Sequence, residues 1–265
     1  MYRKKIDRII KEFIKFRSNM GVKLTLKKAR YIWGKERVSQ LPKGIFNLLG
    51  KKINLKQERV ILSKIRIAKS NMNILLVSDW VKFIGVSGSV AAGFAKEEDD
   101  IDLFIVVRNG SAWIYRGVIR LRNLFKHVIR VKRDGENVKN LFCTNYIVEE
   151  RGLSLERDIF NLHELLYMIP IYQKGYLSSI FSENRWLETE YLVDKRLFNS
   201  KRRVYRGVNI FIVILNYLAY LLQVLFMLIS NHKPEIKRIQ TNYSEGRIQF
   251  FPSDYKERIL KGFYK

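Results

Sequence analysis

Two short apolar runs on either side of a Gly-Ser turn constrain the fold of this chain more than any other feature. The first run, residues 81–86, is rich in Val, Ile and Phe and ends at Ser87-Gly88-Ser89. The second run, residues 101–107, is preceded by Asp100 and carries Asp102. Apolar runs of this length between turn signals are typical of buried strands. The pattern therefore predicts two strands of one sheet that are linked through a tight turn.

The residues of the turn, Ser87, Gly88 and Ser89, have the properties of a phosphate-binding loop. Gly88 has no Cβ, so its backbone can turn sharply and approach a ligand closely. A short helix is expected over 87–95, and the first amides of a helix are unpaired and attract anions. The Ser89 hydroxyl adds a donor at the same place. We therefore expect these three residues to bind a phosphate chain.

Asp100 and Asp102 are candidate metal ligands. At positions i and i+2 of a strand, both carboxylates lie on one face. Two adjacent carboxylates repel each other unless a cation neutralises them. Their oxygens, with room left for water and phosphate, suit Mg²⁺ or Mn²⁺. We take the neighbouring acids at 97–99 to be a solvated spacer.

The pattern resembles the signature of the DNA polymerase β-like nucleotidyltransferase superfamily. It reads Gly88-Ser89, ten residues, then Asp100-Ile101-Asp102-Leu103. The wider stretch 60–172 is similar to a group of predicted bacterial and archaeal nucleotidyltransferases, through pieces such as Cys143-Thr144-Asn145-Tyr146 and His163-Glu164-Leu165. The resemblance implies an α/β (α+β) fold with a small mixed sheet and flanking N- and C-terminal helices. It also implies Mg²⁺-dependent transfer of a nucleoside monophosphate from a triphosphate such as ATP, and it does not name the acceptor.

The superfamily normally has a third carboxylate on a neighbouring strand, and its position here is open. The expected strand, 140–148, contains no acid. Either Asn145 supplies a neutral oxygen, or Glu149 reaches back, or the site has two acids only. Arg116, near the start of an expected helix over 112–126, is a further candidate for nucleotide binding. The alternative to an enzyme is a catalytically inactive nucleotide- or RNA-binding module.

The charge of the chain favours polyanionic partners. Its 265 residues include 50 Lys and Arg against 25 acids, a net charge of +25. RNA is the first candidate partner and anionic lipid the second, although a general enrichment in Lys would give the same composition. The single cysteine, Cys143, cannot form an internal disulfide, and we expect it to be a small core residue. No Cys/His spacing for zinc occurs.

Three regions are expected along the chain: N-terminal helices over 1–78, the nucleotidyltransferase core over 79–175, and C-terminal helices over 176–265. The N-terminal region begins with a basic amphipathic helix that lacks the apolar stretch of a secretory signal, which favours a cytoplasmic protein. We expect this helix to pack on the core. Further helices are predicted over 55–72, over 156–169 with an end at Pro170, over 184–206, and in the tail after 252.

The segment 207–231 contains no charged residue, and its environment is the main open question of the C-terminal region. It is longer than the roughly 20 residues that a membrane span needs. Its polar residues recur every seven positions and form one stripe: Asn209, Asn216, Gln223 and Ser230. We expect a buried helix that is wrapped by protein, with the polar stripe as its outer edge. Membrane association through this segment is the alternative.

Overall fold

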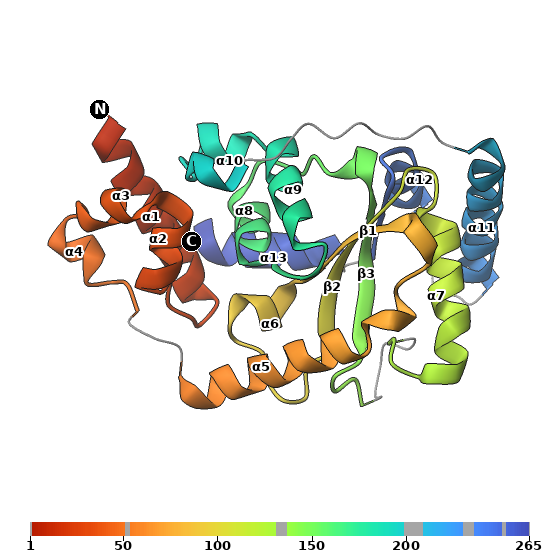
Figure 1. The fold of residues 1–265 in the computed structure, drawn as a ribbon. Helices are drawn as coiled ribbons and strands as arrows, with labels where there is room; N and C mark the ends of the chain where they lie inside the picture. The colour runs from red at the N-terminus through yellow and green to blue at the C-terminus, as the bar shows by residue number, and fades with distance from the viewer. Residues whose placement is uncertain are drawn as a thin grey trace.

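The computed structural model describes residues 2–50, 54–130, 137–198, 209–229, 236–250 and 253–264. A five-stranded sheet with the strand order β4-β1-β2-β3-β5 lies at the centre (Figure 1). Its strands are β1 (Val81–Val86), β2 (Ile101–Val107), β3 (Phe142–Glu149), β4 (Ile169–Tyr172) and β5 (Arg247–Gln249). β2 and β3 are parallel, whereas the other neighbouring pairs are antiparallel. The predicted mixed sheet in an α/β fold is thus confirmed.

The side chains of the central strands alternate between two apolar cores. Ile84 and Ile105 face the core that is shared with α5 (Leu55–Ser70) and α7 (Ala112–Lys126). Phe83 and Phe104 face the opposite core. That second core also receives α8 (Ile159–Tyr167), α9 (Leu177–Glu183) and α10 (Trp186–Thr189). Because both faces are covered, these strands are apolar throughout their length.

The strand β4 differs from the sequence-based expectation. We predicted one helix up to Pro170, but α8 ends at Tyr167 and Pro170 lies within β4. The strand is at the edge of the sheet, where the missing N–H of proline leaves no ladder bond unmade. β5 was also not predicted, because a strand of three residues carries almost no periodic signal.

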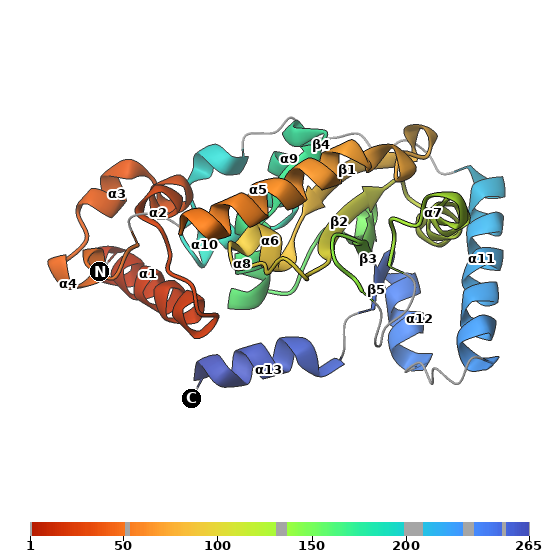
Figure 2. The same cartoon turned by 90° about the horizontal axis from the view of Figure 1, so that it is seen from below.

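The N-terminal helices form a lobe at one end of the molecule (Figure 2). They are α1 (Tyr2–Asn19), α2 (Leu26–Trp33), α3 (Lys35–Ser39) and α4 (Lys43–Phe46). The apolar stripe of α1 is buried, with Ile10 and Phe13 fully inaccessible to solvent. The expectation that this amphipathic helix packs on protein is therefore confirmed. The indole N–H of Trp33 donates to the Tyr191 carbonyl at 3.0 Å, which ties α2 to the chain after α10.

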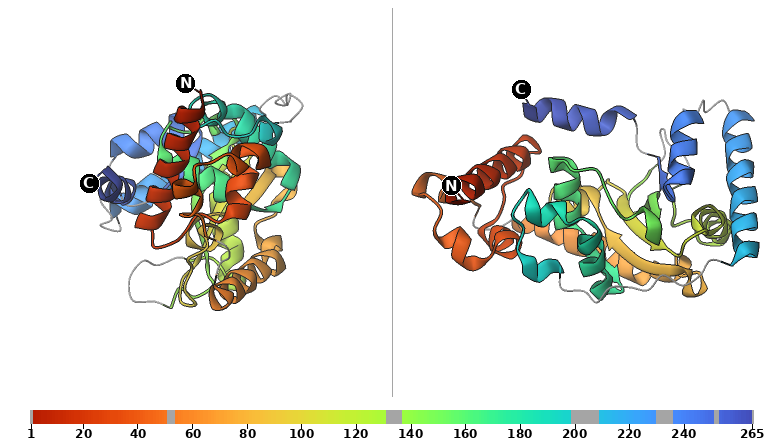
Figure 3. Two further views of the ribbon diagram at one scale, coloured as in Figure 1. Left: turned by 90° about the vertical axis from the view of Figure 1, so that its left-hand side faces the viewer. Right: turned by 90° about the horizontal axis from the view of Figure 1, so that it is seen from above.

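The C-terminal region agrees with the sequence only in part. The helix predicted over 184–206 is wrong within the described residues, because α10 is followed by a turn of 3₁₀ helix at Lys195–Phe198. Residues 199–208 lie outside the described part. Three helices follow: α11 (Ile210–Ile229), α12 (Ile236–Ser244) and α13 (Ser253–Tyr264). The tail helix α13 is as predicted, and it runs back toward the N-terminal lobe (Figure 3).

The helix α11 is oriented opposite to our expectation. Asn216, in the polar stripe, is 2% exposed and faces α7, whereas Ile214, Leu218 and Leu222 on the other side are about half exposed or more. The prediction of a helix wrapped by protein, with its polar stripe outward, is therefore wrong. Ser230 lies outside the described residues. In the ranges that the structure describes, no helix has both the length and the apolar character needed to cross a membrane.

Tertiary contacts explain why Asn216 faces inward. The Asn216 side-chain oxygen accepts hydrogen bonds from the backbone amides of Trp113 at 2.8 Å and Ile114 at 3.2 Å. Glu149, at the end of β3, accepts from the amide of Ala112 at 3.2 Å. These are the first amides of α7, which have no partner within the helix. Asn216 of α11 and Glu149 of β3 thus cap α7, and the Asn216 contacts orient α11.

Candidate active site

The Gly-Ser turn lies directly against β2. It follows β1 and leads into the short helix α6 (Gly88–Ala92). The Ser87 amide donates to the backbone oxygen of Asp102 at 2.9 Å. Gly88 has a φ of +59°, and a Cβ at this position would lie 2.1 Å from the Asp102 Oδ2 atom. Only glycine fits here, because any side chain would clash with a carboxylate and also strain the backbone.

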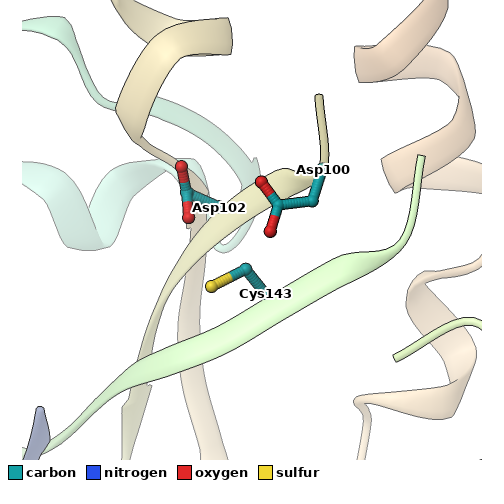
Figure 4. Close-up of side chains that lie close together, drawn as sticks. All are labelled: Asp100, Asp102 and Cys143. Carbon is teal, nitrogen blue, oxygen red and sulfur yellow. The ribbon is translucent and has the colours of Figure 1, made fainter. Parts of the chain in front are cut away.

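Asp100 and Asp102 lie together beside this turn, as the spacing predicts. A ligand atom from each, together with the sulfur of Cys143, forms a group whose members are within 4.8 Å of one another (Figure 4). Asp100 also forms an ion pair with Arg130, whose Nη1 lies 2.8 Å from Oδ2. The turn and the two carboxylates therefore form one site, in which a single ligand can contact the Gly88 backbone and a cation held by the aspartates.

The pKa of Asp102 is raised because its negative charge is buried beside other carboxylates. Burial raises the pKa of Asp102 to about 7, and the neighbouring charge of Asp100 adds to the effect. Glu164 raises this pKa further, while the Cys143 thiol and Arg130 lower it. Without a metal, Asp102 is thus close to half protonated at neutral pH. A divalent cation would reverse this balance by favouring the ionised form.

Ser89 and the loop after α6 are held by hydrogen bonds that a solvated spacer would lack. The Ser89 hydroxyl donates to the Asp99 carboxylate at 3.1 Å, and the Lys96 amide donates to the same oxygen at 2.9 Å. The ammonium of Lys64, on α5, donates to the backbone oxygens of Glu97 at 3.1 Å and Asp99 at 2.6 Å. The interpretation of 97–99 as a spacer is therefore corrected for Asp99, which positions the serine.

Glu149, the acid at the end of β3, lies too far from Asp102 to complete the site, which corrects the alternative that it reaches back. Asp102 pairs with Cys143 in the parallel register, and Glu149 lies six residues further along that strand, about 20 Å away. Glu149 is 1% exposed and pairs with Arg151 at 2.8 Å, in addition to capping α7. The position opposite Asp102 is thus occupied by a thiol. The loss of solvation on burial raises the pKa of Cys143, which keeps this thiol neutral.

Asn145 and Arg116, two further candidates for the site, make contacts that connect neighbouring elements of the fold. The Asn145 carbonyl accepts from the Phe250 amide at 3.0 Å. Arg116 is 6% exposed, donates from Nη1 to the Thr144 carbonyl at 3.1 Å and lies 4.7 Å from the centre of the Phe250 ring. These contacts connect α7, β3 and the chain after β5. The metal-binding role of Asn145 and the nucleotide-binding role of Arg116 stay predictions.

Glu164 is a residue of the site that the sequence reasoning missed. It projects from α8, and its Oε2 atom accepts from the Gly88 amide at 3.4 Å. A negative charge at this amide marks the place where a phosphate oxygen would bind. The only signal in the sequence was its position within His163-Glu164-Leu165, one of the weaker pieces of the family resemblance. Its 76-residue separation from Gly88 has no local pattern that would reveal the contact.

A buried chain of polar residues holds Glu164 and the turn together. His163 Nδ1 lies 3.4 Å from Glu164 Oε1, and His163 Nε2 lies 3.0 Å from Nη1 of Arg17. The same nitrogen of Arg17 donates to the Ala92 carbonyl, at the end of α6, at 2.8 Å. Burial lowers the pKa of His163, so its ring is neutral. Helix α1 therefore supports the site directly, which gives the N-terminal region a structural role.

Comparison with known proteins agrees with this geometry. Residues 72–198 match the family model of the nucleotidyltransferase domain, and this range contains the Gly-Ser turn, Asp100, Asp102 and Glu164. Neither a search of curated proteins nor a search of solved structures gave a significant match. The matched range also includes the central strands β1 to β4. The family match and the mixed sheet together show that residues 72–198 of this chain are a nucleotidyltransferase domain, consistent with the DNA polymerase β-like superfamily.

Proposed function

We propose that this protein transfers a nucleoside monophosphate from a nucleoside triphosphate to an acceptor hydroxyl, with Mg²⁺ or Mn²⁺ as cofactor. The observation that carries the proposal is the direct contact between Gly88 and Asp102, with Asp100 at the same point. A cytoplasmic location is the expectation from the sequence.

The donor set fits a hard divalent cation. Asp100 and Asp102 would hold it, since two carboxylates with space for water and phosphate oxygens suit Mg²⁺ or Mn²⁺. When bound, such an ion stabilises the negative charge that develops on the phosphates. The neutral Cys143 thiol is a softer group than Mg²⁺ prefers. We therefore assign Cys143 to the wall of the site rather than to the ligand set.

The remaining residues bind and orient the triphosphate. We expect the amides of Gly88 and Ser89, at the start of α6, to contact phosphate oxygens, while the Ser87 amide stays bonded to the Asp102 carbonyl. A phosphate at the Gly88 amide would take over the hydrogen bond that Glu164 accepts in the structure. Glu164 would then face the cation side of the site. Holding the α-phosphate in line with the acceptor hydroxyl would add to the rate, because the reacting atoms are then already positioned.

The first prediction concerns the pH dependence of metal binding. Asp102 has a pKa of about 7, so below this pH a cation must displace a proton from it. We expect the affinity for Mn²⁺ to rise roughly tenfold per pH unit between about pH 5 and 7, and to level off above that range. Calorimetric titration with Mn²⁺ in a series of buffers measures this. An affinity that is independent of pH would contradict the role of Asp102.

The second prediction concerns Glu164. In Glu164→Gln, one negative charge beside Asp102 is lost, so Mn²⁺ should bind roughly tenfold more weakly. The pKa of Asp102 should also fall, because Glu164 raises it. The pH profile of Mn²⁺ binding would therefore move toward lower pH, which a purely structural role of Glu164 would not produce. Glu98→Gln is the matched control, since Glu98 is an exposed acid of the adjacent loop. Equal profiles for both variants would exclude Glu164 from the site.

The activity itself is tested with α-labelled ATP, CTP, GTP and UTP in the presence of Mg²⁺ or Mn²⁺. We expect pyrophosphate release and transfer of label to one class of acceptor, such as RNA, protein or a small alcohol. Binding of a triphosphate without pyrophosphate release would support the second candidate, an inactive nucleotide- or RNA-binding module. The thiol in place of a third carboxylate opposite Asp102 is the observation that favours this candidate.

A further inference from the structure

The outward side of α11 is the most apolar exposed surface among the described residues. Of nineteen exposed large apolar residues, eleven are on this one helix. We call these residues the α11 face: Ile210, Phe211, Ile214, Tyr217, Leu218, Leu221, Leu222, Leu225, Phe226, Leu228 and Ile229. Soluble monomers rarely expose a continuous apolar patch of more than a few hundred Å². The concentration of such residues on one helix therefore indicates a surface that another body covers.

The attachment of α11 to the domain keeps this face outward. On its inner side, Asn216 caps the first turn of α7 through two hydrogen bonds. Tyr220 packs edge to face on Trp113, with their ring centres 5.1 Å apart. The helix therefore lies across the end of the molecule opposite the N-terminal lobe, beside α7 (Figures 1 and 2). Removing it from α7 would leave backbone amides of that helix without partners.

The charge of the chain decides between the candidate partners of this face. Residues 199–234, which include α11, contain five Lys or Arg and no acid, and the whole chain has a net charge of +25. A second copy of the chain would bring an equally positive surface to the face and would be repelled. An anionic lipid surface would be attracted by the basic residues and would take up the apolar side chains.

We propose that the α11 face binds to the surface of an anionic phospholipid bilayer, with the helix axis parallel to the membrane plane. An apolar helix face buried at the level of the headgroups, with basic residues on the flanks, is the arrangement of interfacial membrane helices. The sequence pattern left open whether this segment is a core helix or a span. The observed orientation supports a third arrangement, in which the helix is held by protein on one side and covered by lipid on the other. The proposal does not depend on the transfer activity.

The test is co-sedimentation of the full chain with phosphatidylcholine vesicles that contain or lack phosphatidylglycerol. The protein should sediment with the anionic vesicles, less so with the neutral ones, and salt should weaken the binding. The variant Leu222→Gln/Phe226→Gln/Ile229→Gln should bind the anionic vesicles at least roughly tenfold more weakly, because three apolar side chains no longer enter the lipid. The matched control is Leu48→Gln/Leu55→Gln/Leu62→Gln, which replaces three exposed leucines elsewhere and should bind as the wild type does.

Three results would overturn the proposal. The first is a wild-type chain that stays in the supernatant with anionic vesicles, and the second is an α11 variant that binds them as tightly as the wild type. The third is a wild-type dimer in sedimentation equilibrium that the α11 variant dissociates, without vesicle binding, since the face would then be an interface between copies. Circular dichroism and thermal unfolding check that each variant is folded. Since no transfer is measured, failure of the proposed activity would leave this test unaffected.

Discussion

Replacing Asp102 with Asn should abolish nucleotidyl transfer and at the same time stabilise the metal-free protein. Asn lacks the negative charge that would hold the cation beside Gly88. Metal stabilisation of the transferred phosphates is worth several kcal/mol, and about 4 kcal/mol corresponds to roughly a thousandfold in rate. We therefore expect the transfer rate to fall by about that factor or more, measured as pyrophosphate release with saturating triphosphate.

The gain in stability follows from the sign of the pKa shift. The pKa of Asp102 rises from 3.8 to about 7 on folding, so the folded protein binds the proton more tightly than the unfolded chain. The free energy of unfolding therefore falls as pH rises from about 4 to about 7, and the full loss is present above that range. At about 1.4 kcal/mol per pKa unit, the loss has an upper limit of about 4 kcal/mol. Asn removes this cost.

Thermal unfolding of the metal-free proteins at about pH 8 and about pH 4 measures this effect. The midpoint of Asp102→Asn should exceed that of the wild type by several degrees at the higher pH, and the difference should vanish at the lower pH. Glu98→Gln, in the exposed part of the loop, should change neither the midpoint nor the transfer rate. Unchanged activity in Asp102→Asn would end the assignment of the site.

The substitution Gly88→Ala should disable the site by a steric route. The added Cβ would lie 2.1 Å from the Asp102 Oδ2 atom, so the carboxylate or the turn must shift. A positive φ also costs a residue with a Cβ roughly 1–2 kcal/mol. We expect a loss of at least about 2 kcal/mol in the free energy of unfolding. The transfer rate should fall by at least roughly a hundredfold, because a displacement of about 1 Å is enough for that.

Gly21→Ala is the control that separates strain from collision. Gly21 has a φ of +77°, but a Cβ there would have no atom within 4 Å. The two variants therefore share the backbone strain, and only Gly88→Ala adds the clash. Denaturant titration and pyrophosphate release should show a small loss of stability with normal activity for Gly21→Ala. Equal effects of both variants on activity would mean that the Gly88 contact with Asp102 has no functional importance.

Local patterns predicted the centre of this protein well. The strands β1 and β2 have the predicted bounds, and so does the helix α7. Each is specified by an apolar period together with turn residues at its ends, and both signals lie within a short window of sequence. The contact between Gly88 and Asp102 was predictable for the same reason, since a short strand, a turn and a second strand bring the two residues together.

Predictions failed for residues whose position depends on contacts with residues far away in the sequence. Glu149 shares the β-strand period with Asn145 and so seemed able to reach the metal, but the register and the end of α7 direct it elsewhere. Glu164 gave only a weak signal, because its contact with Gly88 depends on how α8 packs over the sheet. The edge strand β4 was hidden by Pro170, which usually ends a helix but is also tolerated at a sheet edge.

Local spacing and composition were enough to predict that two carboxylates face a glycine turn, and that 207–231 is an uncharged helical segment with one polar stripe. Contacts between distant parts of the chain bring Glu164 to the turn and direct Asn216 inward. A period of hydrophobicity shows that a helix has two faces, but it does not show which face meets protein. For α11 that choice was made by unpaired amides of α7, 103 residues earlier in the chain, which the Asn216 side chain satisfies.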